Sequence, residues 1–134
     1  METIDLAQLN YAAIVLASVA HMATGLVWFS RRLFGDAWAR MTGQDLTPAR
    51  AWLPIAALGH LTIGFVLAIL MAFAGVTTIL GGLVIAWLVW LGFVVTLEIG
   101  ELVWEKIPVG LFLIRAGNHF VALSLAGLIL AAWR

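Results

Sequence analysis

Four long apolar stretches take up most of this chain of 134 residues, and they constrain its fold more than any other feature. They cover about residues 9–29, 51–74, 78–104 and 109–133. A helix needs roughly 20 residues to cross about 30 Å of hydrocarbon, and each stretch is that long. Within a bilayer the backbone must satisfy its hydrogen bonds internally, so these stretches are helices. The sequence therefore predicts an all-α integral membrane protein, a four-helix transmembrane bundle forming a single domain over residues 1–134.

The composition agrees with this fold and excludes several classes of function. Only 10% of the residues are charged, against roughly 25% in a soluble domain. The net charge is zero, so no basic surface for nucleic acid is expected. The absence of cysteine excludes thiolate catalysis and cysteine-based metal sites. No GxSxG motif and no phosphate-binding glycine loop is present, and the sequence therefore favours a protein that is not an enzyme.

The connections between the apolar stretches differ in length and content. Residues 75–77 and 106–108 make short turns, whereas residues 30–50 form a long loop. Within this loop the apolar residues recur at helical spacing and the charged residues fall on the opposite side. The apolar residues of this stripe are Leu33, Phe34, Ala37, Trp38 and Met41. The pattern predicts a short amphipathic interfacial helix over about residues 32–42, ended by Thr42-Gly43.

The basic residues predict the orientation of the helices. Most of them lie in the two loops on one side of the membrane, namely Arg31, Arg32, Arg40, Arg50 and Lys106. On the opposite side only Arg134 and the amino terminus are expected. By the positive-inside rule, we expect these loops to be cytoplasmic and both termini to be external.

The three histidines of the chain fall at one depth in the predicted bundle. At about 1.5 Å per residue, His21, His60 and His119 lie roughly 12, 13 and 15 Å from the cytoplasmic end. An ionisable side chain that faces lipid at the centre costs about 2.5–3.5 kcal/mol, so such groups should face one another inside the bundle. We therefore expect a polar centre formed by His21, His60, Glu98, Arg115, Asn118 and His119.

The role of this polar centre has three interpretations. The histidines can be hydrogen-bonded structural groups, or they can form a proton or ion pathway, since imidazole titrates near neutral pH. They can also be metal ligands, with His21, His60 and His119 as candidates, although no tight motif such as HExxH supports a metal.

The charged residues of the third and fourth helices are predicted to lie at different depths in the membrane. Glu98 and Arg115 fall at the same level, and the simplest expectation is a structural ion pair between the two helices. The functional alternative is a carboxylate that exchanges this partner for a histidine. We expect Glu101 closer to the membrane surface, and Glu105 and Lys106 in the headgroup region, so that Glu101 and Glu105 form a solvated helix end.

Several motifs resemble those of a known family. They are Asn10-Tyr11, the G-x-x-W-F-S segment 25–30, the L-F-G-D-A-W segment 33–38 and Thr42-Gly43. These motifs are similar to those of the bacterial membrane family called domain of unknown function 1761. Members often have proline after W-[YF]-S, where this chain has Arg31-Arg32. The resemblance implies a four-helix protein of the bacterial inner (plasma) membrane and supplies no activity or ligand.

The leading hypothesis is a small transport or channel-like protein whose pathway is lined by the polar centre. Because one chain of this size leaves little room for a pathway, we expect a homo-oligomer or a membrane partner in addition to the lipid bilayer. The alternatives are an accessory or scaffold subunit of a membrane complex, and a histidine-ligated metal- or haem-binding membrane protein. No cofactor is predicted under the leading hypothesis, and the sequence names no substrate.

Overall fold

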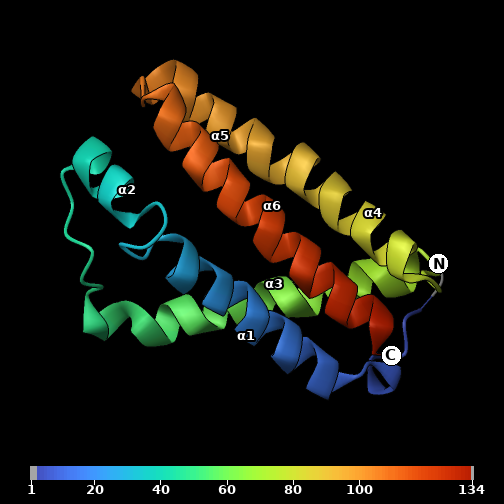
Figure 1. Ribbon diagram of the computed structural model, residues 1–134. Coiled ribbons are helices and arrows are strands. Elements are labelled where there is room, and N and C mark those ends of the chain that lie inside the picture. The colour runs from blue at the N-terminus through green and yellow to red at the C-terminus, as the bar shows by residue number, and fades with distance from the viewer. Residues whose placement is uncertain (1–2, 134) are drawn as a thin grey trace.

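The structure is a computed structural model that describes residues 3–133, and all regular elements in that range are helices (Figure 1). The helices are α1 (Tyr11–Trp28), α2 (Gly35–Thr42), α3 (Leu53–Phe73), α4 (Ile79–Val89), α5 (Thr96–Gly100) and α6 (Val109–Ala132). Short 3-10 turns, Leu6–Gln8 and Arg50–Trp52, precede α1 and α3. Arg134, expected on the external side, lies outside the described residues.

The third apolar stretch is one continuous helix that changes its hydrogen-bonding pattern twice. A π-helical stretch, Trp90–Val95, joins α4 to α5, and a second one, Glu101–Glu105, follows α5. With these stretches included, four helices are long and apolar enough to cross a membrane: Tyr11–Trp28, Arg50–Phe73, Ile79–Glu105 and Val109–Ala132. The predicted all-α, four-span membrane fold is confirmed.

The four spans form a row rather than a closed ring. In Figure 1 the two chain ends lie at one end of the molecule, and α2 and the turn before α6 lie at the other. Helix α1 packs against α3 on one side and α6 on the other, and α6 also packs against α4. Helices α3 and α4 share few contacts and diverge from their short connection (Figure 1). The row is therefore open between α3 and the α4–α5 helix.

Small residues allow the helices in this row to approach closely. A Cβ atom added to Gly82 would lie 2.5 Å from Ala131 Cβ, and one added to Gly127 would lie 2.9 Å from Ala86 Cβ. These four positions lie in the contact between α4 and α6, and they show the dense packing of small residues that drives helix association in lipid. Many large apolar side chains point outward instead, as expected for helices surrounded by hydrocarbon.

The loop after α1 folds back tightly before α2 begins. The backbone N–H of Phe34 donates to Trp28 O at 3.0 Å, and that of Gly35 donates to Ser30 O at 2.9 Å. A side chain on Gly35 would collide with the carbonyl oxygens of Phe29 and Ser30. This compact turn occupies the first residues of the predicted helix, so α2 starts at Gly35 instead of 32. It ends as expected, with Gly43 in the left-handed conformation at φ 68°.

Candidate functional site

A row of four titratable side chains crosses the middle of the protein. His21 Nδ1 on α1 lies 2.8 Å from His60 Nδ1 on α3. On the other side of His21, the His119 ring on α6 has its centroid 6.5 Å away. His119 Nε2 lies 3.6 Å from Glu98 Oε1 on α5. These residues, called the polar line below, run in the order His60, His21, His119 and Glu98 and take one member from each span.

The sequence of α1 explains why His21 reaches across to its neighbours. The nearby hydroxyl groups are satisfied within the helix, because Ser18 Oγ donates to Ile14 O and Thr24 Oγ1 donates to Ala20 O. Gly64 of α3 lies directly against Ser18, so α1 and α3 come close at this level. The imidazole of His21 has no such local carbonyl partner and pairs instead with His60.

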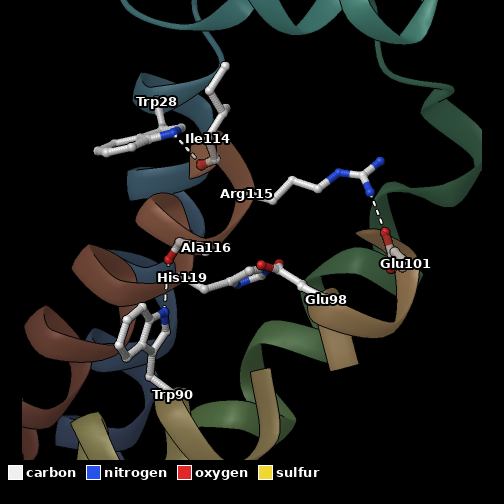
Figure 2. Close-up of polar contacts among 8 residues, drawn as sticks. All are labelled: Trp28, Trp90, Glu98, Glu101, Ile114, Arg115, Ala116 and His119. Atoms are coloured by element: carbon white, nitrogen blue, oxygen red, sulfur yellow. Dashed lines mark hydrogen bonds and ion pairs between the residues drawn. The ribbon is translucent and has the colours of Figure 1, made fainter. Parts of the chain in front are cut away.

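Two members of the polar line are almost fully buried. His21 is 3% exposed and Glu98 is 7% exposed, whereas His60 and His119 are half-buried. Within the described residues, His21 Nε2 and Glu98 Oε2 have no hydrogen-bond partner. Figure 2 shows Glu98 and His119 pointing toward one another across the gap between α5 and α6. A carboxyl group and an imidazole in this arrangement can hold a proton on either group.

The expected Glu98–Arg115 pair is wrong. Arg115 donates to Glu101, and Glu98 faces His119 (Figure 2). Side chains on a helix lean toward its amino end. The amino end of α6 lies beside the last turns of the preceding helix, which contain Glu101. Arg115 therefore reaches Glu101, while His119, one turn deeper, meets Glu98.

The charged residues from α5 to the turn before α6 differ in their exposure. Glu98 is buried, Glu101 is half-buried and paired, and Glu105 and Lys106 are exposed. The Glu101 side chain is 38% exposed, and its ion pair with Arg115 was not predicted from the sequence. Glu105 and Lys106 are exposed, in keeping with their predicted place at the helix end. The polar residues from Glu98 to Arg115 therefore comprise one buried group, one ion pair and one exposed turn.

Asn118 lies beside His119 in sequence but outside the polar line. It is 7% exposed, and its Oδ1 has no hydrogen-bond partner among the described residues. No hydrogen bond joins it to the polar line within residues 3–133. The structure therefore brings together the three histidines and Glu98, leaves Asn118 outside this group, and places Arg115 next to it, bound to Glu101.

Two tryptophans that the sequence did not single out as site residues fix α6 next to the polar line. Trp28 Nε1 donates to Ile114 O at 2.9 Å, and Trp90 Nε1 donates to Ala116 O at 2.8 Å (Figure 2). The two acceptors lie on either side of Arg115 in the sequence. A tryptophan within an apolar helix needs an acceptor for its indole N–H, and this requirement is the signal that could have identified them.

The polar line borders an open groove between α3 and the α4–α5 helix. The cavity measures about 500 Å³. Its walls are apolar, and its polar lining residues include His21, Glu98, Glu101 and His119. The groove occupies the side where α3 and α4 diverge, so apolar walls lead to the buried end of the polar line.

The histidines do not form a recognisable metal centre in the described part of the chain. No three histidine, aspartate or glutamate side chains of residues 3–133 are arranged to hold a metal ion. His21 and His60 direct their Nδ1 atoms at each other. Metal or haem binding by His21, His60 and His119 stays a prediction from the sequence.

Comparison with protein families identifies the group to which the chain belongs. Residues 12–131 match the model of a family described as Protein of unknown function (DUF1761), and the chain is a member of that family. Comparisons with curated proteins and with solved structures gave no match. The family description names no activity, so the arguments about function rest on the polar line and the groove.

Proposed function

We propose that this member of the DUF1761 family is a small membrane transport protein in which Glu98 and His119 bind and release a proton. The observation that carries this proposal is the polar line, in which one titratable group from each span lies next to a group from another span. Structural roles alone need no such alignment, because a single histidine can be satisfied by one carbonyl of its own helix or a neighbour.

The surroundings of Glu98 favour a group that changes its protonation state. An ionised carboxylate removed from water is costly unless a positive charge compensates it. Glu98 forms no direct ion pair with a permanent cation among residues 3–133, because the guanidinium of Arg115 is bound to Glu101 and acts on Glu98 only from a distance. The imidazole of His119 becomes positive only when it gains a proton. With one proton between them, Glu98 and His119 together carry no net charge, whichever of the two holds it. Transfer of this proton from one group to the other requires only small movements of the side chains.

The Glu98–His119 pair has neighbours that can conduct a proton further. On one side, His21 and His60 share a hydrogen bond between imidazoles. On the other, Glu101 and Arg115 lie between Glu98 and the turn that precedes α6. Groups of this kind inside membrane helices characterise proton relays and transport pathways.

We also propose that the protein resides in the bacterial inner membrane with its loops in the cytoplasm, on the basis of the basic residues of those loops. We propose further that it works as a homo-oligomer. A Cβ atom added to Gly59, Gly92 or Gly100 would meet nothing within 4 Å, so another helix can approach these positions closely.

Proton flux into liposomes tests the proposed function. Purified protein is reconstituted with a pH-sensitive dye inside, and a potassium gradient with valinomycin drives protons inward. We expect the wild type to acidify the lumen, and Glu98→Gln and His119→Ala to slow this by at least about tenfold. Glu105→Gln is the matched control, because it makes the same chemical change at an exposed position of the same helix.

Two results would contradict the proposal. One is a wild-type rate equal to that of protein-free liposomes. The other is an unchanged rate in Glu98→Gln when the variant is correctly folded and inserted.

A further inference from the structure

The groove next to the polar line has the form of a ligand site. Its volume of about 500 Å³ falls within the roughly 300–1,000 Å³ typical of small-molecule sites. Val66 and Leu70 of α3 form part of one wall, and Phe93 and Leu97 form part of the other. All four side chains are more than one-third exposed, so the walls are free to contact a bound molecule.

Two residues that line the groove each hold one buried polar atom that lacks a partner. Glu98 Oε2 and His21 Nε2 are both buried, and neither has a hydrogen-bond partner within residues 3–133. Both residues line the groove and are more than nine-tenths buried. In a water-free region a buried polar atom without a partner is costly, so a ligand that supplies one gains affinity.

The charges at this end of the groove favour a positive ligand. Glu98, Glu101 and Arg115 carry two negative charges and one positive charge, and the guanidinium is bound to Glu101. With neutral imidazoles the cluster therefore has a net charge of one negative unit, centred on Glu98. An anion would be repelled there, whereas a single positive charge would balance the carboxylate.

We propose that the groove binds a lipophilic cation, a molecule with an apolar body and one positive charge, with the charge at Glu98 and the body between α3 and α5. This proposal rests on the proposed transport function and names its class of substrate. Because both walls belong to membrane spans, the groove opens sideways toward hydrocarbon, and molecules of this class already concentrate in the membrane. The cation and a proton then compensate the same carboxylate in turn.

Equilibrium binding of tetraphenylphosphonium to the protein in lipid nanodiscs tests this proposal. Tetraphenylborate is the matched probe, since it has nearly the same shape and the opposite charge. We expect saturable binding of the cation and none of the anion. Glu98→Gln should weaken cation binding by about tenfold or more, and Glu105→Gln should leave it unchanged. Val66→Trp, which fills the groove and keeps the carboxylate, should also weaken it.

Three outcomes would overturn the proposal. They are equal binding of both probes, cation binding that survives Glu98→Gln, and cation binding that survives Val66→Trp. Gel filtration and thermal melting establish that each variant is folded. If Glu98→Gln misfolds, the binding measured with Val66→Trp tests the proposal. Cation binding without proton flux would contradict the transport function alone, and proton flux without cation binding would contradict this inference alone.

Discussion

His21 and His60 are joined by a hydrogen bond between their Nδ1 atoms, which lie 2.8 Å apart. A hydrogen bond needs one donor and one acceptor, so only one of these two atoms carries a proton. In the neutral pair, the ring that accepts at Nδ1 therefore has its own proton on Nε2. The protonation of the buried His21 Nε2 is thereby linked to that of His60 on the neighbouring helix.

This pair should contribute measurably to the packing of α1 against α3. Interhelical hydrogen bonds in membrane proteins are worth about 0.6 kcal/mol on average and about 1.7 kcal/mol at most. We expect His21→Ala and His60→Ala each to lower the free energy of unfolding, and the double variant to lower it by less than the sum. A double-mutant cycle of unfolding in sodium dodecyl sulfate measures the coupling. Additive losses would show that the two imidazoles do not interact.

The indole of Trp90 should stabilise the position of α6. Its N–H donates to Ala116 O, so Trp90→Phe removes a partly buried hydrogen bond worth about 1 kcal/mol. Trp104→Phe is the matched control, because Trp104 is 83% exposed. Thermal melting followed by circular dichroism should show a lower transition for Trp90→Phe only. Equal shifts in both variants would contradict the role given to the Trp90 hydrogen bond.

Close contact between α4 and α6 should make Gly127 intolerant of a larger side chain. Gly127→Val places atoms where Ala86 Cβ and the carbonyl oxygen of Gly82 now lie, and overpacking of this kind costs about 1–3 kcal/mol. Gly25→Val is the control, since a Cβ there meets nothing within 4 Å. Yield and melting temperature of the two variants, compared with the wild type, provide the measurement. A control that unfolds as easily as Gly127→Val would indicate a general effect of valine.

The ion pair between Arg115 and Glu101 should affect stability mainly because removing the arginine leaves a carboxylate without a counter-charge. Both side chains are about one-third exposed, so the pair itself is worth roughly 0.2–1 kcal/mol. Arg115→Met leaves Glu101 and Glu98 as two uncompensated carboxylates. We expect this variant to be destabilised and Glu101→Gln to restore part of the loss, measured by unfolding in detergent. Absence of rescue would contradict the pairing.

The sequence predicts the span positions and the level of the histidines because both depend on fixed helix dimensions. The rise of about 1.5 Å per residue places His21, His60 and His119 at one depth, and the cost of facing lipid turns them inward. The structure brings all three together. The neighbours of Glu98 could not be derived in the same way.

Two properties of the α4–α6 hairpin explain that difference. The π-helical stretches before and after α5 change the residues per turn, so faces counted at 3.6 residues shift. The length and direction of Arg115 then decide which glutamate it reaches. The groove was also not predicted. It results from the divergence of α3 and α4, which depends on the angle at which the helices cross, and the hydropathy of the sequence does not indicate that angle.

Infrared difference spectroscopy between acidic and alkaline pH tests the central claim most directly, because it detects protonation of the Glu98 carboxyl group. The protein is measured in lipid nanodiscs, where a protonated buried carboxyl group has a C=O band distinct from that of a carboxylate. The account predicts a titrating band that is present in the wild type and in Glu105→Gln and absent in Glu98→Gln. A spectrum of Glu98→Gln identical to that of the wild type would contradict it.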